Sequence, residues 1–223
     1  MRRIAWTWAL ISICALAGCT SREVIKLHYL GGFVPGTRAI FLPANLAVAP
    51  VGGDLAIGTR EVGKVYSSSG NTEKVLQASD VGAVLHDALM TGLAEAGLKP
   101  IALEAGIDPK ELKNGIDLML MCDVDELAVE KNFGTEQTIH GQYFTMNSRV
   151  KLECKLERRN GSVTYENQLV GVEEEPPKPV GGEVFFPLET EPAESLSVAL
   201  SRAIGGLLTD PKFRAAFPPR TTG

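Results

Sequence analysis

Two segments of the chain alternate between apolar and polar residues, which is the pattern of a β-strand with one buried face. Residues 116–125 and 149–157 both follow this period of two. A third apolar stretch, residues 163–172, comes after a short polar interruption. Shorter apolar runs at residues 46–51 and 101–103 predict two further strands. The pattern therefore predicts a sheet of five strands.

The dipeptide Asn160-Gly161 separates the last two of these strands. Asn-Gly is the preferred two-residue hairpin turn, because both turn positions need positive φ. Closing the hairpin there pairs Arg159 with Ser162, and it brings Lys155 opposite Glu166, a favourable cross-strand pair. On the other face the opposed pairs are Leu156 and Tyr165, Cys154 and Asn167, and Leu152 and Leu169.

Two segments repeat their apolar residues with the 3.6-residue period of an amphipathic helix. The first spans residues 79–97. Ser79 can cap its start, and Gly97 stands where a left-handed residue is favoured at its end. The second spans residues 192–208, and Asp210-Pro211 then predicts one more helical turn.

These elements predict a domain of the α+β class over residues 45–217. Two helices packed on one face of a mixed, mostly antiparallel sheet, a two-layer sandwich, would bury every apolar stripe at once. Residues 19–44 are expected to be a tether, with residues 24–30 or 39–42 as a candidate edge strand lying against the domain, and residues 218–223 a disordered tail. Three polar segments rich in Gly or Pro are expected to be exposed connections: residues 52–77, 131–147 and 176–188. A short hairpin around Arg60 to Tyr66 is one interpretation of the first, and the second is interpreted as the tip of an extended hairpin.

The start of the chain has the parts of a secretory signal peptide: a basic pair, Arg2-Arg3, then an apolar run too short to span a bilayer, then small residues. The run ends in Leu16-Ala17-Gly18-Cys19, which resembles the lipobox of bacterial lipoproteins. The resemblance implies cleavage of a signal spanning residues 1–18, between Gly18 and Cys19, and a diacylglyceryl group with fatty chains such as palmitate on the Cys19 thiol. The alternative is an ordinary cleaved signal with a cysteine there by chance.

Removal of that segment would leave 205 of the 223 residues. It would take the formal net charge from −5 to −7, because both basic residues of the leader go with it. The remaining length is ample for one hydrophobic core. A negative balance without a basic block argues against nucleic acid as a partner and against electrostatic docking on anionic lipid. We therefore expect the N-terminal lipid to supply the contact with the membrane.

Two cysteines remain inside the predicted domain, Cys122 and Cys154. Both belong to the buried faces of predicted strands. A disulfide between them is one interpretation in an oxidising compartment, and two packed thiols are the other. Neither cysteine is part of a Cys-x-x-Cys pair, so no redox or metal motif is predicted here.

The polar residues predict no catalytic or metal site, and no cofactor is expected. Three histidines lack a ligand partner at helical spacing: His28, His86 and His140. Three aspartates lie on the exposed face of one strand, where cross-strand pairs with Arg149 and Lys151 explain them better than a catalytic cluster does: Asp117, Asp123 and Asp125. The chain is interpreted as a protein without enzymatic activity.

Apolar side chains on predicted exposed surfaces are the candidates for contact with another protein. Met119 and Met121 share the face of those aspartates, so they indicate either a partner contact or a patch covered by residues 52–77. Tyr143 and Phe144 lie in the predicted connection and are candidates for the same role.

Several features occur together along the chain: the Leu16–Cys19 motif, the strand at 46–51, the step Ile57-Gly58-Thr59-Arg60, the helix at 79–97 and the final three strands and helix. In this combination the chain resembles the YajG-like lipoproteins and, more loosely, the auxiliary lipoproteins of bacterial ABC transporters. The first resemblance implies a non-enzymatic, periplasm-facing binding or adaptor domain with an envelope protein as its partner. The second implies an auxiliary component of an ABC-type lipid or export system. Thr20 is not the aspartate that resembles an inner-membrane retention signal, so the outer membrane is expected.

Overall fold

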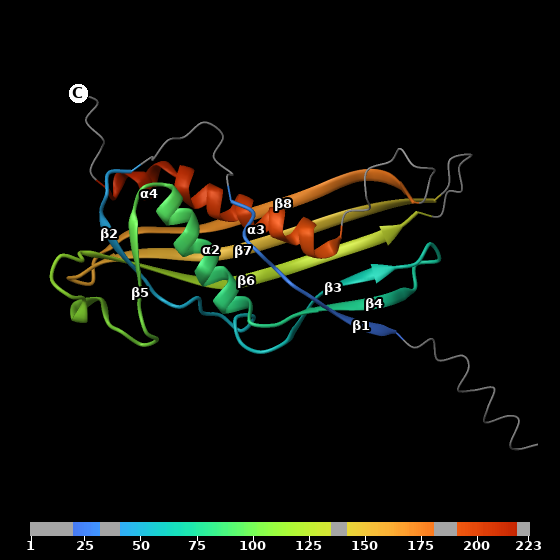
Figure 1. Cartoon of the computed structure of the whole chain (residues 1–223), viewed down its shortest axis with the longest axis horizontal. Helices are drawn as coiled ribbons and strands as arrows, with labels where there is room; N and C mark the ends of the chain where they lie inside the picture. Colours follow the sequence, from blue (N-terminus) through green and yellow to red (C-terminus); the bar gives the residue numbers. More distant parts are fainter. Residues whose placement is uncertain (1–19, 32–40, 135–141, 181–190, 218–223) are drawn as a thin grey trace, which may run out of the picture.

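The computed structural model describes residues 20–31, 41–134, 142–180 and 191–217, with backbone alone at residues 142, 143 and 176–180. These residues form one open eight-stranded sheet with helices on one of its faces (Figure 1). The strands are β1 (Ser21–Ile25), β2 (Asn45–Val48), β3 (Arg60–Tyr66), β4 (Thr72–Ala78), β5 (Lys99–Ala102), β6 (Leu118–Phe133), β7 (Gln142–Arg158) and β8 (Val163–Val180). The helices are α2 (Val81–Glu95), α3 (Pro192–Thr209), α4 (Pro211–Ala215) and the 3-10 turn η1 (Pro109–Glu111).

Strand β6 organises the sheet. Along one edge it pairs antiparallel with β7, which pairs antiparallel with β8. Along the other edge it pairs parallel with β2 near its start and parallel with β3 near its end. β5 continues the sheet beyond β2, and β4 and β1 continue it beyond β3. The α+β class is confirmed, but the sheet is mixed, so the expectation of a mostly antiparallel sheet was wrong.

The β7–β8 hairpin has the predicted register, with Lys155 opposite Glu166. Its turn differs from the prediction. Only Gly161 takes a positive φ, of 82°, and the register shifts by one residue next to the turn. One left-handed glycine beside a bulge is the geometry of a three-residue hairpin loop. Asn160 contributes through its side chain, whose Oδ1 accepts hydrogen bonds from the backbone N–H and the hydroxyl of Ser162 at 3.0 and 2.7 Å.

All three segments that were expected to be connections carry strands. Residues 52–77 contain the β3–β4 hairpin, with β3 over Arg60–Tyr66, where one interpretation of the sequence had placed a hairpin. Strands β6 and β7 run into the segment 131–147 from both sides, and β8 continues through its prolines to Val180. Proline is tolerated there because β8 is an edge strand, so the missing N–H groups need not reach a second neighbour.

Residues placed in the predicted tether also belong to the fold. Residues 21–25 form β1, and the chain then crosses the helices (Figure 1). The backbone N–H groups of His28 and Leu30 donate to the hydroxyls of Ser197 and Ser201, at 3.2 and 3.1 Å. Those two serines are fully buried on α3. The polar positions within its apolar stripe therefore hold the N-terminal segment in place.

The helix boundaries follow the predictions closely. α3 begins at Pro192, and Gly97 is left-handed with φ 102° after α2. Asp210 caps α4 through a hydrogen bond from the backbone N–H of Lys212 at 2.8 Å. At the start of α2 the prediction was wrong: the cap position is Asp80, with φ 54° and no side-chain capping bond, and not Ser79.

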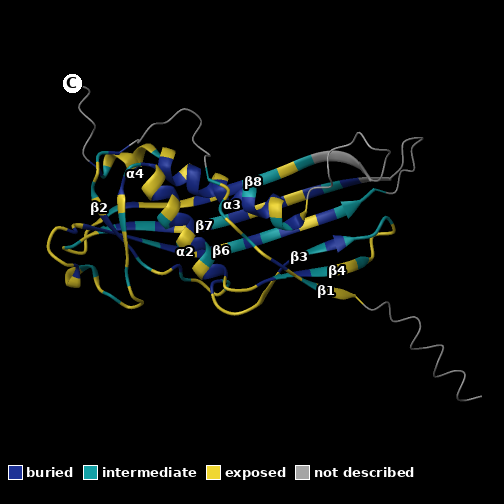
Figure 2. Ribbon diagram, in the orientation of Figure 1, coloured by how far each residue is buried: buried dark blue, intermediate teal, exposed yellow. Residues whose placement is uncertain are grey.

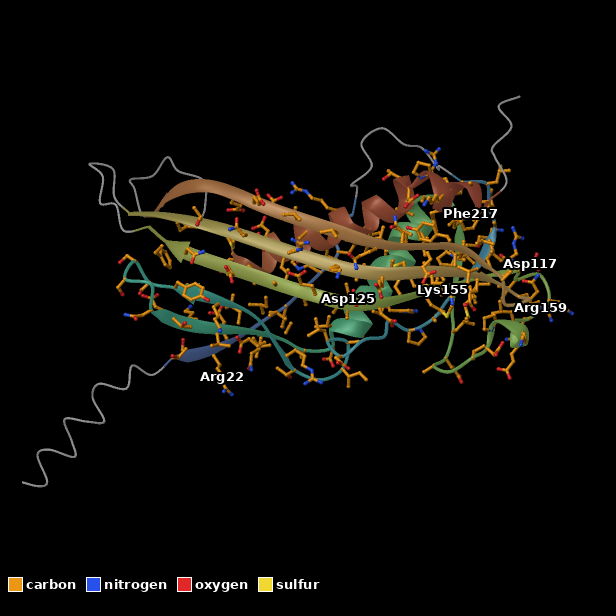
Figure 3. All side chains as sticks on the ribbon, turned by 180° about the vertical axis from the view of Figure 1, so that it is seen from behind. Arg22, Asp117, Asp125, Lys155, Arg159 and Phe217 are labelled. Atoms are coloured by element: carbon orange, nitrogen blue, oxygen red, sulfur yellow. A yellow bond between two sulfur atoms is a disulfide. The ribbon has the colours of Figure 1, made fainter. Side chains whose placement is uncertain are left out.

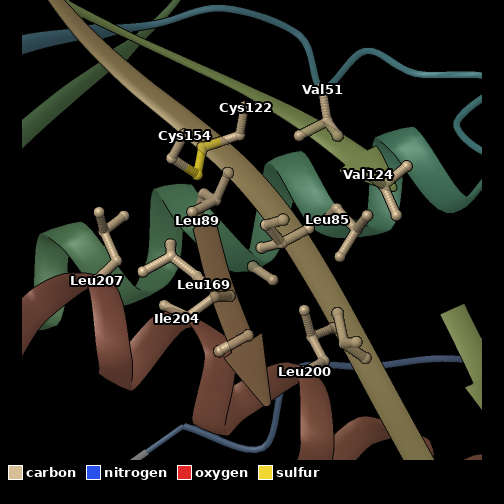
Figure 4. Close-up of a cluster of buried hydrophobic side chains, with 14 of the residues drawn as sticks. Val51, Leu85, Leu89, Cys122, Val124, Cys154, Leu169, Leu200, Ile204 and Leu207 are labelled. Carbon is tan, nitrogen blue, oxygen red and sulfur yellow. A yellow bond between two sulfur atoms is a disulfide. The ribbon is translucent and has the colours of Figure 1, made fainter. Parts of the chain in front are cut away.

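The core lies between the helices and the sheet, and Figure 2 shows this buried layer. α3 packs against β6, β7 and β8, and α2 packs against α3 and β5. The close-up in Figure 4 shows leucines of both helices meeting the inner faces of these strands. α3 can approach β8 closely because position 171 is glycine. A Cβ built on Gly171 would lie 1.8 Å from the carbonyl oxygen of Ala199.

Aromatic packing and one carboxylate hold α4 against the edge of the sheet. Phe213 is fully buried and makes edge contacts with Phe41 and Tyr165. Asp210 accepts hydrogen bonds from Asn167 Nδ2 at 2.7 Å and from the Tyr165 hydroxyl at 3.2 Å. Desolvation on its own would raise the pKa of Asp210, but these hydrogen bonds and those from the backbone outweigh it and lower that pKa.

Replacing Gly171 by alanine should destabilise the protein, because the new methyl group must displace the backbone of α3. We expect the free energy of unfolding to fall by about 2–3 kcal/mol in urea denaturation, as in overpacked cores. Gly206→Ala is the matched control: it lies in α3 itself, where an added Cβ would meet no atom within 4 Å, and should raise stability by about 0.5–1 kcal/mol. Equal stability of Gly171→Ala and the parent would contradict the close packing.

The contribution of Asp210 should depend on pH. A carboxylate whose pKa is lowered by folding stabilises the protein above its unfolded pKa, near 3.8, and this stabilisation is lost as the pH falls through the lower folded value. Asp210→Asn should therefore be less stable than the parent at neutral pH, with a difference that shrinks below about pH 4. Thermal unfolding across the pH range measures this. The exposed Asp54→Asn is the control, and a difference for Asp210→Asn that does not vary with pH would contradict the assignment.

Candidate functional site

The outer face of β6, β7 and β8, opposite the helices, carries many charged side chains (Figure 3). Lys151 Nζ lies 3.4 Å from Asp125 Oδ2, and Arg149 Nε lies 3.2 Å from Glu126 Oε2. All four side chains are partly exposed. The aspartates of β6 therefore lie on the exposed face, as the alternation predicts, and Asp125 forms a cross-strand charge pair. Pairs of this kind contribute about 0–1 kcal/mol each, so they shape the surface more than they stabilise it.

A shallow groove lies on this face, between these two ion pairs and the β7–β8 turn. Its lining comes from β6, β7 and β8: Met121, Asp123, Glu153, Lys155, Glu157, Glu166 and Gln168, together with atoms of Cys154 and Asn167. Lys155 forms an ion pair with Glu157. The hydrogen bond to Glu157 and the charges of Glu157 and Glu166 raise the pKa of Lys155. With four carboxylates and one ammonium group, the groove is acidic.

Met119 and Met121 do not form one exposed patch. Met119 is 1% exposed and packs with Ala47, Leu112 and Ile116 in a small second cluster on the outer face. The segment around η1 covers it, and residues 52–77 do not. Met119 is therefore a buried residue and not a contact residue, whereas Met121 is half-buried and lines the groove.

Phe144 is also buried, at 1% exposure, which corrects its assignment as a contact residue. Its ring lies 6.4 Å from that of Phe133, and the ammonium group of Lys131 lies 4.6 Å from its centroid. Phe144 faces inward because the regular alternation of β7 places it on the same face as Cys154. Lys131 and Phe133 face inward because a bulge in β6 between Val124 and Glu126 shifts the alternation of that strand by one residue. The side chain of Tyr143 lies outside the described residues.

Sequence reasoning missed three buried polar residues. Lys131 is 5% exposed, and the hydroxyls of Ser148 and Ser195 lie 2.8 Å apart on β7 and α3. The β6 bulge, which alternation alone does not reveal, places Lys131 inside. The two serines carry a sequence signal, because Ser148 continues the alternation that begins at Val150 and Ser195 lies one turn before Ala199 on the apolar stripe of α3.

Cys122 and Cys154 lie directly opposite each other on β6 and β7, and their sulfurs are bonded (Figure 4). Both residues face the helices, at 3% and 1% exposure. Of the two interpretations that the sequence left open, the structure contains the disulfide. Its burial keeps it away from reductants while the protein is folded.

The remaining sequence candidates bring no chemistry together. His86 Nδ1 lies 3.8 Å from Asp87 Oδ1, next to it on α2. Across the described ranges no group of three or more His, Cys, Asp or Glu side chains is placed to hold a metal ion. Gly18, Cys19 and His140 lie outside the described residues. None of the described helices is long and apolar enough to cross a bilayer.

Comparisons with known proteins identify the fold. The sequence matches no family model and no curated protein. The structure resembles that of protein XCC0632 from Xanthomonas campestris, of the DUF330 family, with a TM-score of 0.51 at 13% identity, covering 88% of this chain and 97% of that one. The chain therefore shares the fold of XCC0632.

Two further solved structures superpose less well. A proposed homolog of the neuraminyllactose-binding hemagglutinin from Helicobacter pylori gives a TM-score of 0.41 at 9% identity, covering 87% of this chain and 96% of that one. Lipoprotein GNA1162 from Neisseria meningitidis gives 0.33 at 18% identity, covering 59% and 84%. Neither likeness adds to the fold assignment.

Loss of the disulfide should lower stability. The bridge joins residues 32 positions apart, and closing a loop of that size contributes about 2–4 kcal/mol. A reductant should therefore reduce the free energy of unfolding of the parent by about that amount in urea denaturation. It should leave a variant carrying Cys122→Ala and Cys154→Ala unchanged. The bridge is exposed in unfolded molecules, so a parent whose unfolding curve is unchanged after equilibration with reductant in urea would contradict it.

Proposed function

We propose that the protein is a lipid-anchored protein of the bacterial cell envelope that acts as a non-catalytic binding or adaptor domain. The observation that carries this proposal is the motif Leu16-Ala17-Gly18-Cys19, which ends an apolar leader that begins after Arg2-Arg3. A lipobox belongs at the end of such a leader, because the acylated cysteine becomes the first residue of the mature protein.

The energetics of anchoring favour lipid over protein contacts for membrane attachment. Each buried methylene of a fatty chain contributes about 0.8 kcal/mol, and two or more chains give stable anchoring. The domain itself is acidic, and the exposed face of β6–β8 carries carboxylates beside its basic residues. Anionic headgroups would not attract such a surface.

An adaptor role fits what the sheet leaves uncovered. The helices occupy one face, and the groove around Met121 lies on the other, where an envelope protein can reach it. The partner we propose is therefore another envelope protein, with a basic or polar contact surface. The polar groups that line the groove lie on the surface, so the groove itself offers no buried acid or base for an enzymatic role.

The finer assignments are part of the same proposal. Thr20 in place of aspartate favours the outer membrane over the inner membrane, with the domain facing the periplasm. The resemblance to YajG-like lipoproteins supports an adaptor of that kind. Recovery of an ABC permease or its substrate-binding subunit with the lipidated protein from solubilised membranes would favour the alternative, an auxiliary lipoprotein of a transport system.

Metabolic labelling with a palmitate analogue tests the anchor. The parent should incorporate the label, and Cys19→Ala should lose it and leave the membrane fraction. Cys14→Ala is the matched control, because this cysteine lies inside the proposed leader and should leave labelling unchanged. Equal labelling of the parent and Cys19→Ala would overturn the proposal.

A further inference from the structure

The register of three strands fixes the end of the molecule at which the described chain begins. Ser21 lies beside Lys74, Lys74 beside Val65, and Val65 beside Lys131. Ser21 is therefore level with the last residues of β6. β1 then runs back toward the middle of the sheet, so its first residue is the one nearest that end.

Covalent geometry places residue 19 at the same end. Consecutive Cα atoms are about 3.8 Å apart, so the Cα of Cys19 lies within about 8 Å of that of Ser21 in any conformation. The residues that could have formed a long tether are used inside the fold: β1 pairs with β4, and His28 and Leu30 are hydrogen-bonded to α3.

The β3–β4 turn lies at this end and carries no charged residue: the chain there reads Tyr66-Ser67-Ser68-Ser69-Gly70-Asn71-Thr72. Residues 66–70 line a shallow hollow with Asn132 and Phe133. β8 reaches the same end, where Lys178 is level with Phe133. We call this set, residues 66–72 with Asn132 and Phe133, the anchor end. Next to it, Lys74 Nζ pairs with Glu23 Oε2 at 2.8 Å, which neutralises both charges.

The opposite end of the sheet differs in character. The β7–β8 turn and the residues beside it include Asp117, Arg158 and Arg159. Figure 3 shows Asp117 and Arg159 at one end and Arg22 of β1 at the other. Tyr66 is level with Asn132, and Leu118 is level with Arg158. At about 3.3 Å per residue, the two ends are about 45 Å apart along β6.

We propose that the anchor end rests on the phospholipid bilayer and that the sheet holds the acidic groove away from it. This inference rests on the acylation of Cys19 proposed above. A lipid at Cys19 can enter the bilayer only if the anchor end comes to the headgroups, because no free chain separates the two. An uncharged, hydroxyl- and amide-rich turn with aromatic neighbours suits the headgroup region. The groove at Met121 then lies about 35 Å along β6 from Asn132, several Debye lengths from the anionic headgroups.

Two matched serines allow a direct test. Ser69 and Ser162 are both exposed, and each lies in a hairpin turn, one at either end of the sheet. With Cys19 acylated and Cys122 bonded to Cys154, Ser69→Cys or Ser162→Cys would add the one reactive thiol of the mature protein. Each lipidated variant, labelled with an environment-sensitive fluorophore, is placed in vesicles of phosphatidylethanolamine and phosphatidylglycerol that carry headgroup-nitroxide lipid.

The nitroxide lipid should quench the fluorophore at position 69, and the emission of this fluorophore should shift to the blue. The emission of the fluorophore at position 162 should be the same in vesicles as in detergent. A linker of about 20 Gly and Ser residues inserted between Thr20 and Ser21 spans about 25 Å. It should remove the quenching at position 69 while the lipid remains.

The outcomes separate this inference from the proposed function. Mass spectrometry of the same samples reports the state of Cys19. Three results with an acylated Cys19 would overturn the orientation and leave the anchor intact. They are no quenching at position 69, equal quenching at both positions, and quenching at position 69 that persists after the linker is inserted. An unmodified Cys19 would overturn the proposed function and this inference with it.

Discussion

The need to satisfy the backbone groups of one long strand governs this fold. β6 is 16 residues long, and no single neighbour covers its edge opposite β7. β2 pairs with its start and β3 with its end, and residues 49–52 bridge the interval through hydrogen bonds to Leu120, Cys122 and Val124. Gly52-Gly53 makes this possible, because a Cβ on Gly52 would lie 2.2 Å from Asp123 Oδ1 and one on Gly53 2.6 Å from Val124 O. Gly53 therefore allows close approach of the two backbones, and Gly52 leaves room for the Asp123 carboxylate.

This arrangement explains which parts of the fold the sequence could predict. The β7–β8 register depends on residues that are close in the chain and on alternation that must match on both faces, so local reasoning found it. The pairing of β6 with β2 and β3 joins segments far apart in the chain through backbone groups that every sequence has. No side-chain pattern specifies such a pairing. The β6 bulge is likewise not specified by any side-chain pattern. It shifts the alternation of β6 by one residue and so places Lys131 inside the protein.

The candidate contact residues show the same limit. Alternation correctly put Met119 and Met121 on the face away from the helices, but it cannot say what else covers that face. The segment around η1 buries Met119 and leaves Met121 at the groove. Which side of a strand a residue occupies is local information, whereas its exposure depends on a segment that packs there from elsewhere in the chain. Only Met121 of the four predicted contact residues has a described side chain that reaches the candidate groove.

The N-terminal segment decides how such a domain can meet a partner. A flexible tether of about 25 residues would let the domain move over a distance of about 25–30 Å from its attachment point. Pairing of β1 with β4, and the hydrogen bonds to Ser197 and Ser201, hold residues 21–30 of that segment within the fold. Without a flexible tether the domain reaches less far from its attachment point, but its orientation is better defined. A sheet held at one end presents its other surfaces at a fixed height above that point. For the adaptor role proposed above, this would lower the orientational cost of each encounter with a partner that is itself confined to the envelope.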